Sequence, residues 1–154
     1  MILIDTNAMP ATIVEQAEWP AFGVQAQQKG VPSIVPTITP QMLTGAERLL
    51  SVPATTEMMD ILAEASLAGV TGGGQTLAIR PDDTSLLPTI AVPALVLVGL
   101  DDPIYSTEIS EMIKDAILTS QLSVIPVAEH ASIYEQPAYA NFLIAQFAAR
   151  LPSN

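Results

Sequence analysis

The sequence contains no cysteine, one histidine and only five basic residues among its 154. The lack of cysteine excludes disulfide bridges and thiolate metal sites, and it fits a protein of the cytoplasm. One histidine without cysteine supplies too few of the usual zinc ligands, so we expect neither a metal nor another cofactor. Long hydrophobic runs are missing as well. Residues 1–5 are too short an apolar run for a signal peptide, and residues 90–100 are too short and too interrupted by proline to span a bilayer.

Positive charge is scarce relative to negative charge. Sixteen acidic residues against five basic ones give a net charge of -11. Such a surface repels phosphate backbones and anionic lipid headgroups, so we expect no nucleic-acid partner and no membrane partner. The chain is nevertheless 49% hydrophobic and 14% charged, which argues for a folded core. We therefore expect a soluble cytoplasmic protein with an acidic surface.

The chain is expected to form a single domain over residues 1–154, in three parts. Residues 1–7 contain a first strand and its turn, residues 8–88 form a helical, cap-like region, and residues 89–154 form a strand, a helix, a strand and a helix. Prolines, Pro20 among them, are expected to break the cap-like region into short helices. Thr39 and Pro40 should open one helix to about residue 50. A second is expected from residue 55 or 56 to 67, and a third after the glycine triplet at 72–74.

Two short apolar runs predict neighbouring strands near the end of the chain. Residues 94–98 and 122–127 are rich in leucine and β-branched residues without polar alternation, which is typical of parallel strands covered on both faces. Residues 107–118 between them carry apolar side chains at helical spacing. Because such crossovers are almost always right-handed and usually join adjacent strands, both strands should end at the same edge of the sheet. Asp102 and His130 follow those two ends.

This edge is where open α/β sheets place their chemistry. A carboxylate at Asp102 could hold the imidazole of His130 in one tautomer and stabilise its charged form, as a general base requires. The pair would then be two members of a catalytic triad. Two ordinary roles remain open: His130 as a hydrogen-bonded loop residue, and Asp102 as a helix cap or turn residue.

Three stretches resemble the C-terminal half of proteins of the α/β-hydrolase superfamily. Arg80-Pro-Asp82 and the run ending Leu100-Asp-Asp-Pro103 are similar to the segment that leads into the strand bearing the triad acid. Val124-Ile-Pro-Val-Ala-Glu-His130, followed by an amphipathic helix, is similar to the histidine loop and the last helix. The resemblance implies a partial α/β-hydrolase fold, with a short parallel sheet of about three strands flanked by helices and a helical cap segment. It also implies that Asp102 is the triad acid and His130 the base.

The sequence departs from the family pattern in its nucleophile. The family places a serine on a Gly-x-Ser-x-Gly turn ahead of the acid and the histidine, and no such motif occurs here. Ser66 has the nearest context, but its glycine spacing is wrong and we expect it inside a helix. The strand-loop that would supply the oxyanion hole is missing too. In addition, Glu129 precedes His130 where the family usually has glycine.

Two functions therefore stay open. The chain could be the acid and base half of a serine hydrolase for ester, lactone or related acyl substrates, inactive alone and completed by a separate chain. Alternatively, it could be a non-catalytic module that binds a small apolar ligand or another copy of itself. The strand at residues 2–5 should present a bare apolar edge, so we expect a homodimer or a complex with the chain that supplies the missing half. A monomer in which the cap helices cover the sheet is the alternative.

Overall fold

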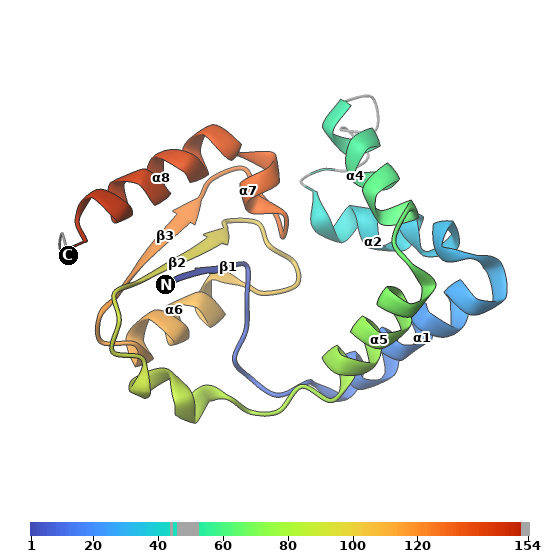
Figure 1. Ribbon diagram of the computed structural model, residues 1–154, viewed down its shortest axis with the longest axis horizontal. Helices are drawn as coiled ribbons and strands as arrows, with labels where there is room; N and C mark the ends of the chain where they lie inside the picture. The colour runs from blue at the N-terminus through green and yellow to red at the C-terminus, as the bar shows by residue number, and fades with distance from the viewer. Residues whose placement is uncertain (44, 46–52, 152–154) are drawn as a thin grey trace. The chain divides into compact units, whose positions relative to one another are not determined.

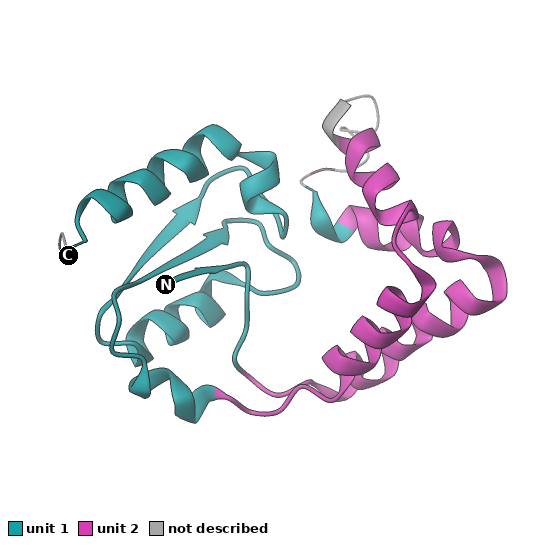
Figure 2. Ribbon diagram, in the orientation of Figure 1, with its two compact units in different colours: residues 1–8, 41–44, 84–154 teal, residues 9–40, 45–83 magenta. Residues whose placement is uncertain are grey.

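The computed structural model describes residues 1–43, 45 and 53–151. The chain divides into two compact units, which Figure 2 colours separately. The first, here called the sheet unit, comprises residues 1–8, 41–44 and 84–154; the second, the helical unit, comprises residues 9–40 and 45–83. Each unit is described by itself. The expectation of a single domain over the whole chain stays a prediction.

The sheet unit contains a parallel sheet of three strands in the order β1-β2-β3 (Figure 1). The strands are β1 (Ile2–Ile4), β2 (Ala94–Gly99) and β3 (Ser120–Ile125). Every residue of the central strand β2 is buried, which explains why its sequence is apolar without alternation. The prediction of a short parallel α/β sheet is confirmed. Strand β3 ends two residues earlier than predicted, because Pro126 has no N–H to donate and Val127 adopts a φ of 54°.

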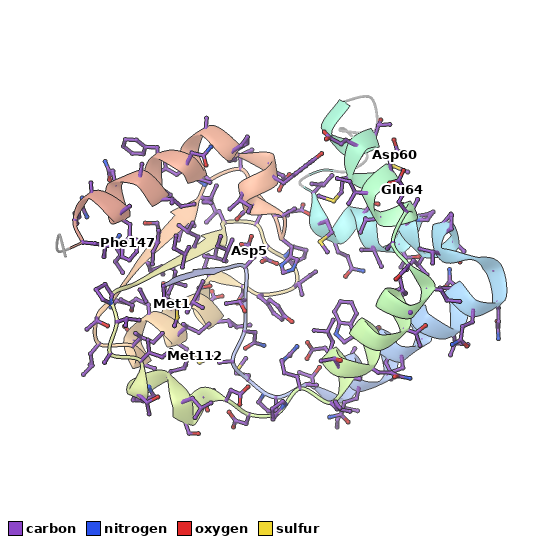
Figure 3. All side chains as sticks on the ribbon, viewed as in Figure 1. Met1, Asp5, Asp60, Glu64, Met112 and Phe147 are labelled. Atoms are coloured by element: carbon purple, nitrogen blue, oxygen red, sulfur yellow. The ribbon has the colours of Figure 1, made fainter. Side chains whose placement is uncertain are left out.

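Helices cover both faces of this sheet (Figure 1). On one face, α6 (Thr107–Ala116) and the residue after it pack Ile113 and Ile117 against Ala94 and Val96. On the other face, α8 (Pro137–Ala149) packs against alternate residues of β2, and its Phe147 joins the core there (Figure 3). A short helix, α7 (Ser132–Glu135), links β3 to α8, and a 3₁₀ turn, η2 (Thr84–Thr89), leads into β2.

The helical unit is built around two long helices, α1 (Ile13–Lys29) and α5 (Leu67–Ala78), which pack along each other. Between them the chain forms η1 (Val31–Ile34), α2 (Val35–Met42) and α4 (Pro53–Ala63). A capping box opens α1: the Thr12 hydroxyl accepts from the Glu15 N–H, and the Glu15 carboxylate accepts from the Thr12 N–H. Arg80 then pairs with the same carboxylate at 2.9 Å, which ties the segment after α5 to the start of α1.

Four expectations for the helical unit were wrong, and the first two concern prolines. Helix α1 continues through Pro20. A proline removes one helical hydrogen bond, and the packing of α1 along α5 outweighs that loss. Pro40 lies inside α2, and the hydroxyl of Thr39 donates to the Val35 carbonyl at 2.8 Å, so this threonine does not cap a helix. The rest of the helix expected there falls on residues 46–52, outside the described part of the chain.

The glycine triplet also lies elsewhere than expected, inside α5 and not ahead of it. Gly74 explains this, since a Cβ there would lie 2.5 Å from the Trp19 carbonyl oxygen of α1. The glycine is therefore needed for close approach of two helices. Ser66, expected inside a helix, instead caps α5 by accepting from the Gly69 N–H at 3.0 Å.

None of the helices in the described residues is long and apolar enough to cross a membrane.

Candidate active site

Two loops meet at the edge of the sheet where the parallel strands end. The loop after β2 carries Asp102, which we call the acid loop, and the loop after β3 carries His130, the histidine loop. Because β2 and β3 are parallel neighbours, their carboxyl ends lie side by side. The structure therefore brings the two sequence-predicted residues to one place.

The Asp102 carboxylate binds the His130 imidazole directly. Its Oδ2 lies 2.9 Å from Nδ1 of His130, and the Asp102 side chain is fully buried. The other oxygen, Oδ1, accepts hydrogen bonds from the backbone N–H groups of Ile104 at 2.8 Å and Tyr105 at 2.9 Å. One carboxylate thus forms a turn with one oxygen and an imidazole pair with the other, so the turn role considered above does not compete with the pairing.

The tautomer of His130 follows from its partner. An ionised carboxylate only accepts hydrogen bonds, so Nδ1 must carry the shared proton, and in the neutral ring Nε2 then holds the lone pair. The ring is 18% exposed, which leaves part of it within reach of other molecules. Tyr105 packs edge-on against it, with ring centroids 5.4 Å apart and planes at 75°. This arrangement can accept a proton at Nε2 and keep the resulting imidazolium beside a buried negative charge.

Gly99, the last residue of β2, is required by the close approach of the histidine loop. A Cβ at this position would lie 2.2 Å from the Glu129 carbonyl oxygen and 2.5 Å from that of Ala128. The next residues of the acid loop bond to the same neighbouring segment, with Asp101 N–H donating to the Ala128 carbonyl at 3.0 Å. The two loops are therefore fixed to each other through their backbones.

Sequence reasoning missed a second acidic residue, Asp5, which follows β1 (labelled in Figure 3). Its Oδ1 accepts from the Gly99 N–H at 3.1 Å. Its Oδ2 accepts from the hydroxyl of Ser132 at 2.6 Å and from the Ser132 N–H at 3.2 Å. The available signal was its position, because residues after the carboxyl end of any parallel strand gather at the same sheet edge.

Burial raises the pKa of the Asp5 carboxyl above its ordinary value of 3.8. The hydrogen bonds from Ser132 and Gly99 act in the opposite direction, and so does electrostatic attraction to the His130 imidazole, but desolvation is the largest contribution. Asp5 is thus a partly buried acid that interacts with the ends of both loops and with the histidine.

The remaining sequence expectations concern the nucleophile and metals. Ser132 is near His130 in sequence, but its hydroxyl donates to Asp5. Ser66 caps α5 in the helical unit. Among the described residues, no three metal-ligating side chains form a cluster that could hold an ion. Glu129, beside the histidine, donates its backbone N–H to the Glu135 carboxylate at 2.6 Å, which holds the histidine loop against α7.

No protein-family model matches the chain, and comparison with curated proteins finds no match either. Solved structures do match. A thermophilic esterase from Thermogutta terrifontis is 28% identical with a TM-score of 0.88, and the match covers 97% of this chain and 55% of the esterase. An enol-lactonase from Burkholderia xenovorans LB400 is 19% identical with a TM-score of 0.85, over 97% of this chain and 55% of that one.

A further match is an α/β-hydrolase enzyme from a Medee basin deep-sea metagenome library, 16% identical with a TM-score of 0.79, over 100% of this chain and 57% of the enzyme. Each match covers nearly all of the present chain. The chain therefore has the fold of part of an α/β-hydrolase, and it spans about half the length of the solved enzymes that it matches.

Proposed function

We propose that this chain supplies the acid and the base of a serine hydrolase whose nucleophile lies in another polypeptide segment. The observation that carries the proposal is the buried Asp102 carboxylate, 2.9 Å from Nδ1 of a partly exposed His130 at the end of two parallel strands. Similarity to an esterase and an enol-lactonase supports ester or lactone substrates.

In this proposal each group has a defined task. Nε2 of His130 accepts the proton of a serine hydroxyl as its oxygen attacks the carbonyl carbon, and the imidazolium later returns that proton to the leaving oxygen. Asp102 keeps Nδ1 protonated and stabilises the imidazolium between these two steps. Donors for the oxyanion must come from the segment that carries the serine.

The outer edge of β1 is the proposed contact with that segment. In the described sheet, β1 pairs with β2 alone. The Met1 carbonyl and the Asp5 N–H both bond to β2, so the N–H groups of the alternate residues Ile2 and Ile4 point to the opposite side. A further parallel strand can add to this edge. We propose that the missing half contributes it, and that the chain alone uses the same edge to pair with a second copy.

Activity measurements test the proposal in two arms. The chain alone should not react with a fluorophosphonate probe and should hydrolyse p-nitrophenyl butyrate no faster than its His130→Ala variant. With the complementary N-terminal part of the Thermogutta terrifontis esterase added, hydrolysis should appear for the wild type. It should fall by about 100-fold or more for His130→Ala and Asp102→Asn.

Two results would overturn this function. Stoichiometric labelling of a serine in the chain alone would show that no second half is needed. A complex that forms by light scattering but hydrolyses the ester equally well with His130→Ala would remove the histidine from the reaction.

A second candidate function, binding of a small apolar molecule, is favoured by a pocket in the helical unit. The pocket has a volume of about 200 Å³ and a mainly apolar lining, with Trp19, Phe22, Ile38, Leu62 and Gly73 among the lining residues. A cavity of about 150 Å³ lined by apolar side chains holds one benzene molecule. We propose that this pocket accepts one aromatic ring or a short alkyl chain.

The single tryptophan of the chain lines this pocket and reports on its contents. Toluene should change the Trp19 fluorescence saturably. Gly73→Leu should abolish the change, because Gly73 lines the pocket and a Cβ there meets nothing within 4 Å. Gly72→Leu is the matched control: its Cβ also meets nothing within 4 Å, but Gly72 does not line the pocket. Equal responses in both variants would exclude binding at this site.

A further inference from the structure

We infer that Asp5 is a positioning residue, whose carboxylate holds the acid loop and the histidine loop in the register that lets Asp102 meet His130. The inference rests on the proposed function of that pair. Asp5 follows a third strand, β1, and the hydrogen bonds described for its carboxylate do not involve either ring nitrogen of His130.

The first argument is topological. Ile4 is the last residue of β1 and lies opposite Leu97 of β2, and the Asp5 N–H continues this ladder by donating to the Leu97 carbonyl at 2.9 Å. This places the Asp5 side chain at the end of β2, where the acid loop begins.

The second argument is the distribution of its hydrogen bonds. One oxygen binds the backbone of Gly99, three residues before Asp102. The other binds both the N–H and the hydroxyl of Ser132, two residues after His130. A single rigid carboxylate therefore links the two chain segments on which the acid and the base stand.

The third argument is energetic. Asp5 adopts a φ of 43°, in the left-handed region that costs free energy for a residue with a Cβ, although aspartate tolerates it better than most. Partial burial also disfavours its ionised carboxylate. Both costs must be offset by the contacts that the side chain makes. Its three donors lie at the ends of the two loops, on Gly99, which ends β2, and on Ser132, which begins α7.

The test uses the single histidine of the chain as a spectroscopic reporter. With ¹⁵N-labelled histidine, the imidazole nitrogen shifts give the tautomer of His130, and the exchange of its Nδ1 proton with water gives the strength of the bond to Asp102. In Asp5→Asn the side chain keeps its size and tolerates the same backbone conformation, but it loses an acceptor oxygen. We expect the Nδ1 proton to exchange about tenfold faster or more, with the nitrogen shifts moving toward a mixture of tautomers.

Asp101→Asn is the matched control, because it removes the same charge from an exposed position beside Asp102. We expect its Nδ1 exchange and nitrogen shifts to equal those of the wild type. A merely structural role for Asp5 would lower the urea midpoint without moving the tautomer. That outcome would overturn the inference and leave the proposed function standing.

Two further outcomes are informative. If the wild type itself shows no preference for the Nδ1 tautomer, the Asp102–His130 pair is not formed, and both the function and the inference fail. If Asp5→Asn does not fold, Ser132→Ala replaces it, since this variant removes the hydroxyl and keeps the Ser132 N–H bond. It should then give a smaller rise in exchange, about two- to fivefold, and an unchanged rate would overturn the inference.

Discussion

At the scale of single residues, the site depends on a position that has no side chain. Because Gly99 has no Cβ, the histidine loop can pass close to β2. The carbonyl oxygens of Ala128 and Glu129 occupy the space that a Cβ would fill. The acid loop begins at the same residue, and Asp5 binds its N–H. A change at this position should therefore act on stability and on the imidazole pair together.

We expect Gly99→Ala to lower the free energy of unfolding by about 1–3 kcal/mol, because the added methyl group forces the two loops apart. Urea denaturation followed by circular dichroism measures this. Gly72→Ala serves as the control: its Cβ has open space, and it should be neutral or stabilising by up to about 1 kcal/mol. Equal stability of Gly99→Ala and the wild type would contradict the described loop packing.

The partly buried acid Asp5 should give the free energy of unfolding a particular pH dependence. Its pKa in the folded protein lies above the ordinary value of 3.8, so the folded state binds this proton more tightly than the unfolded state. The associated stability is fully present below the unfolded pKa and is lost as pH rises through the folded pKa. As pH rises through that window, we expect the free energy of unfolding of the wild type to fall relative to that of Asp5→Asn. Urea titrations from about pH 3 to about pH 7 measure it.

Ser132→Ala provides the opposite test of the same group. The Ser132 hydroxyl lowers the pKa of Asp5, so removing it should raise that pKa further and extend the window to higher pH. Carboxyl ¹³C shifts of Asp5 follow the titration directly. An Asp5 pKa that stayed the same or fell in this variant would show that the hydroxyl does not bind the carboxylate.

At the scale of elements, the crossing of α1 and α5 determines the helical unit. Two glycines make it possible: Gly74 faces the Trp19 carbonyl, and a Cβ on Gly23 would lie 3.2 Å from the Cα of Thr71. Three consecutive glycines make α5 a poor helix in isolation, with each costing about 1 kcal/mol relative to alanine. The helix forms because its packing against α1 offsets this cost, with Gly74 at the close contact.

Gly74→Ala should therefore separate the two helices, and we expect it to destabilise the unit by about 1–3 kcal/mol despite the better helix propensity of alanine. Gly73→Ala, with open space for its methyl group, should not destabilise it. Thermal unfolding followed by Trp19 fluorescence compares the two. If Gly73→Ala were less stable than Gly74→Ala, this would contradict the described close contact between α1 and α5 at Gly74.

These elements also show what the sequence could and could not predict. Strands β2 and β3 and helices α6 and α8 were predictable. Buried parallel strands and the amphipathic α6 leave local patterns, and α8 is an apolar stretch that begins with a proline. Asp102 and His130 followed from those patterns. Asp5 did not, although the strand ahead of it was predicted, because its partners Gly99 and Ser132 are far away in the sequence. The continuity of α1 through Pro20 and the position of the glycine triplet depend on contacts between helices, and local propensity points the other way.

At the scale of the whole molecule, the exposed edge of β1 should control association. We expect the chain alone to elute as a homodimer in gel filtration with light scattering, at about twice its monomer mass of 16.2 kDa. Ile2→Pro should shift it toward the monomer. It removes an outward N–H from the edge and leaves the bonds of Met1 and Asp5 to β2 in place. A wild-type peak at 16.2 kDa that persists at high concentration would reject pairing through this edge.

Strands β1 and β2 are adjacent in the sheet, but the helical unit separates them in the sequence. This separation should affect the order of folding. Ile2 pairs with Leu95, whereas Ala94 pairs with Ser120. Pairing Ile2 with Leu95 closes a loop about three and a half times longer than the loop closed by pairing Ala94 with Ser120. The longer loop costs about 1 kcal/mol more in chain entropy. The β2-α6-β3 segment should therefore fold first and β1 should dock last, bringing Asp5 to two loops that already exist. Substitutions in β1 should then accelerate unfolding and leave the folding rate nearly unchanged.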